Sequence, residues 1–406
     1  MNTAKFKDSP LGPIPQDWEM KRLGEIGEPL MCKRVLKHQT SDQGDIPFYK
    51  IGTFGKTPDA YITRSLFESL RSKYPFPRKG DCLISAAGTI GRVVVYNGED
   101  AYFQDSNIVW IDNDESVVTN EYLALCYALM KWQSEDGGII SRLYNANLKA
   151  QIIVCPPLPE QQRIAEALGE VDKLIESLDE QIEKKRLIAK GVAHDLLTGK
   201  KRLPGFKGEW KSIRLGELSD IVTGGTPSTE VPAFWGGDIR WMNSGDVHLK
   251  RIRDVDGRIT QLGYTSSNTR LIPRGSVVIA LAGQGKTRGT AAITECELCT
   301  NQSIGAILPS EKHDSECLYY VLAMQYEKLR AASSGDGTRG GLSKKILEEY
   351  MVKLPVDIAE QQAIADLLSE QDAAIAALEG KREKYVRIKE GMMRDLLTGK
   401  VRMKGE

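Results

Sequence analysis

Apolar residues recur at alternating steps of four and three along two long stretches of the chain. Polar and charged residues occupy most of the positions between them. This spacing is the a/d pattern of a coiled coil, sustained over several heptads. We therefore predict two long helices of roughly 38 residues, each about 57 Å in length at the α-helical rise. The predicted seam consists of Ile164, Leu168, Val171, Ile175, Leu178, Ile182, Val192, Leu196, Ile364, Leu368, Ile375, Leu378, Tyr385, Met392 and Leu396.

The two stretches are copies of one another, shifted by 200 positions. Glu160-Gln161-Gln162 returns as Glu360-Gln361-Gln362, and the segment 195–200 returns as 395–400. A long internal repeat determines the architecture and is considered before any single motif. Two matching seams in one chain favour antiparallel packing of the two helices on each other. The alternative is two amphipathic helices in separate cores, but globular helices seldom exceed about 20 residues.

Four polar residues interrupt the seams, Lys185 in the first copy and Gln371, Arg382 and Lys389 in the second. A polar residue in a coiled-coil seam can fix the register of the two helices. Gly199 and Gly399 follow the two helices at the position that favours a helix-ending glycine. In the second copy four residues separate Pro355 from Glu360, and we expect them to shift the helix entry by a turn.

The segments outside the helices repeat more loosely. Trp18 and the run 22–25 return, shifted by 192 positions, as Trp210 and the run 214–217. Short apolar runs bounded by glycine, proline and polar residues follow in the same order in both copies, which indicates short strands and turns. We predict an α/β (α+β) protein with an internal pseudo-twofold: two domains of mixed sheet and helices, separated by the antiparallel coiled coil. The predicted boundaries are 1–156 and 201–355 for the domains, and 157–200 and 356–406 for the helices.

Composition adds limits rather than a function. The chain has 406 residues, with 55 lysines and arginines against 55 aspartates and glutamates, so net charge does not point to a nucleic-acid partner. No apolar run has the 18 or more residues that span a bilayer, and the N-terminus has no signal-peptide core. Seven cysteines, an odd number in a long chain, favour reduced thiols and a cytoplasmic location.

The sequence contains no convincing catalytic set. The run 280–287 ends in Gly285-Lys286-Thr287 and resembles a P-loop, but strand-like residues follow where a P-loop would open a helix. Cys296 and Cys299 have the spacing of a zinc ligand pair without a second pair. Four scattered histidines complete neither site. We expect no metal, no cofactor bound by this chain and no catalytic residue, and we interpret Lys286 and Arg288 as a cationic hairpin tip.

Basic and amide side chains in the loops of both domains are the candidates for DNA contact. Such side chains bind phosphates or read base edges, although any one of them can equally be a solvated surface group. The candidates are Lys50, Lys56, Arg64, Arg71, Lys73, Arg92, Arg142, Asn145, Asn147, Asn243, Lys250, Arg251, Arg253, Lys286, Arg288 and Arg339.

Two variable domains, two matching helices, the run 157–162 and the repeated Leu-Leu-Thr-Gly-Lys resemble the specificity subunit of bacterial type I restriction–modification systems. The resemblance covers nearly the whole chain. It implies that each domain reads one half of a bipartite site on double-stranded DNA and that the coiled coil sets the distance between the halves. It also implies two methyltransferase (modification) subunits, which methylate adenine N6 using S-adenosylmethionine. Motor-nuclease (restriction) subunits, which use ATP and Mg, would join the complex.

Two other functions remain open from the residues alone. A coiled-coil scaffold without its own DNA readout would share the seams and need none of the loop cations. An NTPase acting through Gly285-Lys286-Thr287 would show a nucleotide-dependent change in melting temperature. Neither alternative accounts for the duplicated domains as directly as split-site recognition, because a rigid spacer joins two modest half-site affinities into one.

Overall fold

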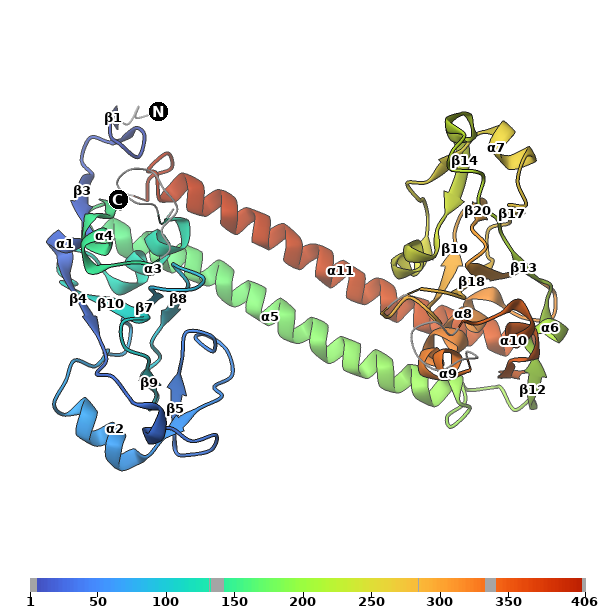
Figure 1. The fold of residues 1–406 in the computed structure, drawn as a ribbon, viewed down its shortest axis with the longest axis horizontal. Helices are drawn as coiled ribbons and strands as arrows, with labels where there is room; N and C mark the ends of the chain where they lie inside the picture. The colour runs from blue at the N-terminus through green and yellow to red at the C-terminus, as the bar shows by residue number, and fades with distance from the viewer. Residues whose placement is uncertain (1–5, 131, 133–141, 284, 333–340, 404–406) are drawn as a thin grey trace. The chain divides into compact units, whose positions relative to one another are not determined.

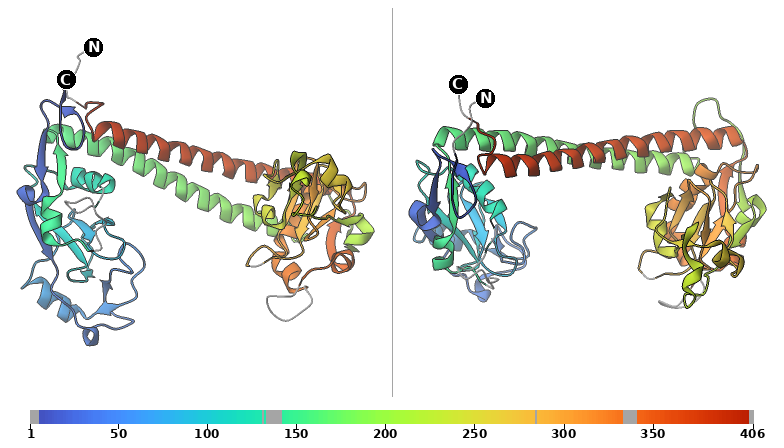
Figure 2. Two further views of the ribbon diagram at one scale, coloured as in Figure 1. Left: turned by 45° about the horizontal axis from the view of Figure 1, so that its top comes forward. Right: turned by 90° about the horizontal axis from the view of Figure 1, so that it is seen from above.

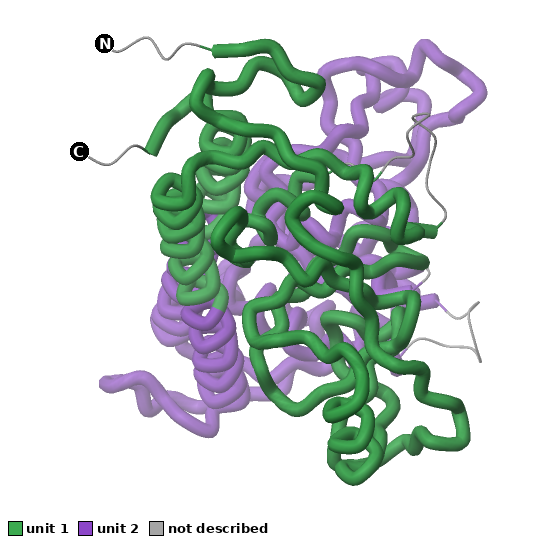
Figure 3. The backbone as a smooth tube through the Cα atoms, turned by 90° about the vertical axis from the view of Figure 1, so that its left-hand side faces the viewer, with its two compact units in different colours: residues 1–179, 381–406 green, residues 180–380 purple. Residues whose placement is uncertain are grey.

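The computed structural model describes residues 6–130, 132, 142–283, 285–332 and 341–403. The chain divides into two compact units, residues 1–179 with 381–406 (unit 1) and residues 180–380 (unit 2) (Figure 3). Each unit holds one domain and part of each of two long helices, α5 (Leu158–Leu197) and α11 (Ile358–Leu396) (Figure 1). The helices have 40 and 39 residues, close to the predicted length.

In unit 1 the main sheet has four antiparallel strands in the order β4 (Gly27–Met31), β10 (Ile108–Asn113), β7 (Cys82–Ser85) and β8 (Val93–Val95). A second sheet of three strands has the order β6 (Tyr61–Ile62), β5 (Ile46–Tyr49) and β9 (Tyr102–Phe103). Two strand pairs complete the unit, β1 (Phe6–Lys7) with β2 (Ile14–Pro15) and β3 (Glu19–Arg22) with β11 (Ile152–Cys155). Its short helices are α1 (Leu23–Ile26), η1 (Lys37–Gln39), α2 (Arg64–Arg71), α3 (Asn120–Leu129) and α4 (Asn145–Ala150).

Unit 2 repeats this plan with one more strand in each of its two sheets. Its main sheet has the order β13 (Ile221–Thr223), β21 (Ile304–Ile307), β18 (Val277–Ala280), β19 (Ala291–Thr294) and β15 (Arg251–Ile252). The second sheet has the order β16 (Arg258–Ile259), β14 (Trp235–Met242), β20 (Leu298–Thr300) and β17 (Leu271–Ile272), and β12 (Trp210–Arg214) pairs with β22 (Met351–Pro355). Its short helices are α6 (Leu215–Leu218), η2 (Pro232–Phe234), η3 (Ser244–Leu249), α7 (Gln261–Thr265), α8 (Ser315–Met324), α9 (Tyr326–Ala331) and α10 (Lys344–Glu349).

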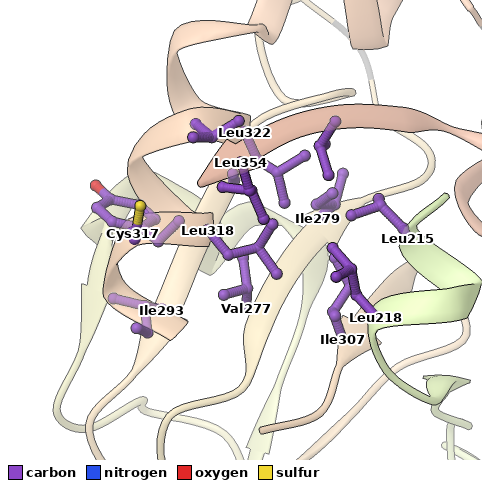
Figure 4. Close-up of a cluster of buried hydrophobic side chains, with 14 of the residues drawn as sticks. Leu215, Leu218, Val277, Ile279, Ile293, Ile307, Cys317, Leu318, Leu322 and Leu354 are labelled. Atoms are coloured by element: carbon purple, nitrogen blue, oxygen red, sulfur yellow. The ribbon is translucent and has the colours of Figure 1, made fainter. Parts of the chain in front are cut away.

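The core of each domain continues into the long helices. In unit 2, side chains from α6, α8 and the main sheet pack together, among them Leu215, Val277 and Leu318 (Figure 4). The same cluster includes Leu196 and Leu197 from the end of α5 and Ile364 and Leu368 from the start of α11. The core of unit 1 has the matching composition, with Ile164 and Leu168 from α5, Leu396 from the end of α11 and Leu397 directly after it. Each domain is therefore anchored to the start of one helix and the end of the other.

Within each unit the two helices run antiparallel (Figure 2). In unit 1 Arg382 pairs with Asp179 and Lys389 pairs with Asp172, each at 2.5 Å, so residue numbers rise on one helix as they fall on the other. In unit 2 Arg186 pairs with Glu379 at 2.6 Å in the same sense. Of the predicted seam residues, seven are only partly buried. The others are buried: Ile164, Leu168, Leu178, Ile182, Leu196, Ile364, Leu368 and Leu396.

The polar seam residues differ in their roles. Arg382 and Lys389 reach carboxylates of the facing helix in unit 1, whereas Lys185 is exposed. The Gln371 side-chain oxygen is buried and has no hydrogen-bond partner among the described residues.

The predicted shift of the second helix entry is wrong. Helix α5 begins at Leu158 and α11 at Ile358, so the offset of 200 holds at the entry as well. Asp357 accepts a hydrogen bond from the Ala359 amide at 2.9 Å, and this contact lets the helix start without the prolines of the first copy.

In the part of the chain that the structure describes, no helix combines the length and the apolar character needed to cross a membrane.

Candidate nucleic-acid interface

The ends of the long helices are fixed to their domains by a buried carboxylate in each unit. In unit 1 Glu160 accepts hydrogen bonds from Arg402 at 2.8 Å, from the Trp18 indole at 3.1 Å and from the Met403 amide at 3.0 Å. The Arg402 guanidinium lies over the Trp18 ring, 5.4 Å from its centroid, and also binds Asp17. Burial alone would raise the pKa of Glu160, but the hydrogen bonds from Arg402, Trp18 and Met403 outweigh it and hold this pKa below its usual range.

Unit 2 repeats this clamp with the equivalent residues. Glu360 accepts two hydrogen bonds from Arg202, at 2.5 and 2.6 Å. Arg202 lies over the Trp210 ring, 5.6 Å from its centroid. Glu360 and Arg202 stand 200 positions from Glu160 and Arg402, and Trp210 stands 192 positions from Trp18. In each unit the clamp thus joins the start of one helix, the residues after the other helix and the domain.

The glutamine after each clamp glutamate joins the helix to the domain through backbone atoms. The Gln161 side chain accepts a hydrogen bond from the Thr119 amide at 3.0 Å and donates to the Pro156 carbonyl at 2.9 Å. Gln361 accepts from the Asp314 amide and donates to the Pro355 carbonyl, both at 2.8 Å. Thr119 and Asp314 cap α3 and α8, so the repeated Glu-Gln pair holds the same helix in both domains.

Loops of unit 1 gather at one edge of its main sheet, where β4 and β7 end and β8 and β10 begin. The Ala86 amide donates to the Asn107 carbonyl at 2.7 Å, and the Leu143 amide donates to the Ala86 carbonyl at 2.8 Å. Gln104 accepts a hydrogen bond from the Ile51 amide at 2.9 Å and so joins the loop after β5 to this edge.

The same edge of unit 2 carries the same backbone bonds. The Leu281 amide donates to the Ser303 carbonyl at 2.8 Å, and the Leu342 amide donates to the Leu281 carbonyl at 2.9 Å. The backbone frame is duplicated while the side chains on it differ between the two units.

Four of the candidate cations in unit 1 belong to loops at this edge. Arg92 donates to the Phe54 carbonyl at 2.9 Å and Arg142 donates to the Ser106 hydroxyl at 3.0 Å. Lys50 pairs with Asp59 at 2.9 Å, and Lys56 is exposed. Ser106 has a φ of 53°, an uncommon conformation for serine that Arg142 helps to hold.

The other candidates in unit 1 lie on short helices or next to them. Arg64 and Arg71 of α2 share Asp100 at 2.8 and 3.6 Å, and Arg71 also lies over the Phe76 ring. Lys73 is exposed just after α2. Asn145 and Asn147 are in the first turn of α4, where the Asn147 carbonyl accepts a hydrogen bond from Gln151.

In unit 2 the structure gives several candidates an internal role. Asn243 caps η3 by accepting from the Gly245 amide at 2.7 Å, and Lys250 ends that helix with a φ of 62°. Arg251 donates to Glu316 at 2.9 Å, to Tyr320 and to Ser369 of α11, and these contacts, with the Glu316 hydrogen bond the strongest, raise its pKa. Arg251 therefore joins the domain to the long helix.

The remaining candidates of unit 2 are more accessible. Arg253 pairs with Glu295 at 2.7 Å and is largely exposed. Lys286 is exposed and Arg288 is half-buried in the turn between β18 and β19. Arg339 lies outside the described residues.

The two catalytic motifs considered from the sequence have other structures here. The P-loop-like run connects two antiparallel strands, β18 and β19, and no helix follows it. Cys296 is half-buried and Cys299 is buried, and burial raises the pKa of the Cys299 thiol to about 11. Among the described residues, no group of three or more histidine, cysteine or acidic side chains is arranged to hold a metal ion.

Two side-chain pairs at the sheet edges were not among the candidates. Arg34 of unit 1 donates through Nε to Asp105 at 2.9 Å, and Thr226 of unit 2 donates to Gln302 at 2.6 Å. The offset of 192 between Trp18 and Trp210 also relates Arg34 to Thr226, and this alignment could have drawn attention to the pair.

Comparison with known proteins agrees with this duplicated plan. Residues 15–185 and 207–386 each match the family described as "Type I restriction modification DNA specificity domain". The chain belongs to this family.

Two relatives show how far the similarity extends. A putative type I restriction enzyme specificity subunit of Haemophilus influenzae is 58% identical over 158 residues, which are 39% of this chain and 41% of that protein. A putative specificity subunit of Methanocaldococcus jannaschii is 25% identical over 98% of this chain and 97% of its own length. The first similarity is strong over less than half of either protein, whereas the second is weak but spans both.

Solved structures give the fold independently of sequence. The type I restriction–modification S subunit from M. genitalium matches with a TM-score of 0.62 at 15% identity, covering 98% of this chain and 97% of that chain. At this identity the match shows the fold alone, two domains of mixed sheet and helices with two long helices.

Proposed function

We propose that the domain of each unit reads one half of a bipartite DNA site and that α5 and α11 set the spacing between the halves. DNA target recognition and assembly with other subunits are the functions of this family. The assignment of one half-site to each domain rests on the duplication. The observation that supports it best is the repetition of the Glu–Arg–Trp clamp and the sheet-edge bonds in both units.

We further propose that two methyltransferase subunits dock on the long helices. Identical residues repeat at exposed or half-buried positions that make none of the clamp contacts. They are Lys184 with Lys384, Ile188 with Ile388 and Gly191 with Gly391. Ile188 is 53% exposed and Ile388 is 38% exposed, and a Cβ added at either glycine would meet no neighbouring atom.

The two glycines strengthen the argument for a partner. A glycine inside a helix costs about 1 kcal/mol relative to alanine. Nothing in the described chain packs close enough to Gly191 or Gly391 to require it. Close approach of a partner subunit at both copies would explain the repeated glycine and isoleucine.

Substitution of the repeated isoleucines tests the docking. The double variant Ile188→Asp, Ile388→Asp should form a complex without any methyltransferase subunit, as measured by native mass spectrometry. Each single variant should retain one methyltransferase subunit. Leu187→Asp is the matched control, because Leu187 is 71% exposed but its repeat partner is Arg387. Two bound subunits in the double variant would contradict this docking surface.

The half-site assignment is tested by methylation. The chain, co-purified with its methyltransferase subunits, should direct adenine methylation to one split motif in a randomised plasmid library read by single-molecule sequencing. Sequence-independent methylation, or a single uninterrupted motif, would contradict the assignment.

The chemistry of the complex belongs to its partners in this proposal. The chain acts as a non-catalytic specificity subunit, and S-adenosylmethionine, ATP and Mg are used by the methyltransferase and motor-nuclease subunits. A cytoplasmic location is supported by the DNA substrate and by the seven cysteines, all of which are free thiols.

A further inference from the structure

We propose that Arg34 and Gln302 are base-reading residues at the equivalent crossing of loops in the two recognition domains, Arg34 on the first loop of its crossing and Gln302 on the second loop of the other. In this view Arg34 recognises guanine and Gln302 recognises adenine. The inference rests on the proposed function and adds to it the residues and the base classes.

The two residues occupy the same crossing of loops. Arg34 lies three residues after Met31, the end of β4, and Thr226 lies three residues after Thr223, the end of β13. Asp105 lies three residues before β10 and Gln302 lies two residues before β21. In unit 1 a side chain in the loop after β4 therefore hydrogen-bonds a side chain in the loop before β10, the strand that pairs with β4. In unit 2 the loop after β13 and the loop before β21 are joined in the same way, and β13 pairs with β21.

Each pair stands at a hollow of polar character. Arg34 and Asp105 line a hollow of about 470 Å³ in unit 1. Thr226 and Gln302 line a hollow of about 680 Å³ in unit 2. Its other polar side chains include Ser228, Thr265 and Asn268, and none of the side chains that line it is charged. The first hollow carries arginine, lysine and aspartate side chains, whereas the polar side chains of the second are hydroxyls and amides. The two domains thus present different chemistry on the same frame.

The hydrogen bond within each pair orients an exposed side chain, Arg34 in unit 1 and Gln302 in unit 2. Asp105 holds Arg34 through Nε, while the arginine side chain remains 67% exposed. Its two terminal amino groups are then positioned as a fork, the geometry that binds guanine O6 and N7. The loop beneath is braced, because Arg142 binds Ser106 next to Asp105.

Gln302 is oriented in the corresponding way. The Thr226 hydroxyl donates to Gln302 Oε1, which leaves a second lone pair on that oxygen and both Nε2 hydrogens for another partner. An exposed carboxamide with one acceptor and one donor matches adenine N6 and N7. Thr226 and Asp105 act as positioning residues.

The test maps methylation motifs of the reconstituted complex. Arg34→Ala should relax one G·C position in one half of the site, with a loss of preference of about 5- to 150-fold. Arg34→Lys should lose much of the same preference, because lysine lacks the fork. Gln302→Ala should relax one A·T position in the other half and leave the first half unchanged.

Matched controls come from the same units. Arg78→Ala removes another exposed arginine of unit 1 that pairs with an aspartate, and Gln261→Ala removes an exposed glutamine of α7; both should leave the motif unchanged. Thr226→Val should weaken the preference at the position that Gln302 reads and at no other.

The outcomes separate this inference from the proposed function. A wild-type complex without a split motif would contradict the proposed function itself. A split motif that Arg34→Ala and Gln302→Ala leave unaltered in every position would overturn the base-reading assignment alone. A uniform drop in methylation at all sites would also overturn it, because that result indicates phosphate contact or folding.

Discussion

At the scale of single residues, the repeated Glu-Gln motif is explained by contacts inside the chain. Glu160 and Glu360 are buried and bind Arg402 and Arg202, so any unpaired carboxylate there would be costly. The identity of the two helix copies at these positions follows from the buried Glu–Arg pair that both copies make. The exposed Ile188 and Ile388 receive no such explanation from the chain and remain the residues for which a partner is proposed.

We expect Glu160→Gln to lower the stability of unit 1 by about 1–3 kcal/mol, because a charged acceptor of four hydrogen bonds becomes neutral. The effect is measured as a fall in the thermal unfolding midpoint. Glu166→Gln, at an exposed position of the same helix, is the control and should unfold as the wild type does.

The same clamp predicts a dependence on pH. Because the folded pKa of Glu160 is lowered, its contribution is complete above the unfolded pKa of about 4.3 and is lost as pH falls through the folded value. The difference in midpoint between the wild type and Glu160→Gln should therefore be constant near neutral pH and shrink below about pH 4.3. A difference that grows with acidity would contradict this assignment.

In the candidate site, the roles of some single residues could not be predicted from the sequence. The cationic loops of both domains could be recognised, and Arg92 and Arg142 do belong to one sheet edge. Arg251 could not be distinguished from them, because its partners Glu316 and Ser369 are 65 and 118 positions away. Arg34 was missed because its significance depends on Asp105, which only folding brings within 2.9 Å.

At the scale of elements, the heptad pattern predicted α5 and α11 well because periodicity is a local property. The partners of the polar seam residues could not be predicted in the same way. Arg382 and Lys389 find Asp179 and Asp172, whereas Gln371 leaves a buried oxygen without a partner among the described residues. The corresponding position of the first helix is Val171, so an apolar side chain is tolerated there in the repeat.

Gln371→Leu should therefore stabilise unit 2 by about 1 kcal/mol, since it removes a buried unsatisfied acceptor and adds apolar contact. The unfolding midpoint should rise by about 2–4 °C for a unit of this size. Gln362→Leu, at an exposed position of the same helix, should leave the midpoint unchanged. A lower midpoint for Gln371→Leu would indicate that the glutamine makes a stabilising contact.

At the scale of the whole molecule, duplication was the most informative feature of the sequence. It predicted two domains and two helices before any motif was assigned, and the structure extends it to individual hydrogen bonds. The offset of 192 in the domains also aligns the loops that follow β4 and β13, so that Arg34 and Thr226 correspond. What the duplication could not give is the base that each loop selects, since the lining side chains diverge freely between the copies.

The spacing role leads to a prediction that respects the pairing of the helices. Asp179 of α5 faces Arg382 of α11, so lengthening one helix alone would break these contacts. Seven residues inserted after Glu180 and seven after Gly380 keep the heptad register in both helices and add about 10.5 Å to each. At about 3.4 Å per base pair, the spacer of the methylated motif should lengthen by about three base pairs while both half-sites stay the same. Single-molecule sequencing of the methylated library measures the spacer directly.

An unchanged spacer would show that the helices do not set the distance, whereas altered half-sites would show that the insertion disturbs the domains. Insertion of seven residues after Glu180 alone is the control, and it should reduce methylation at every site because the two helices no longer match in length.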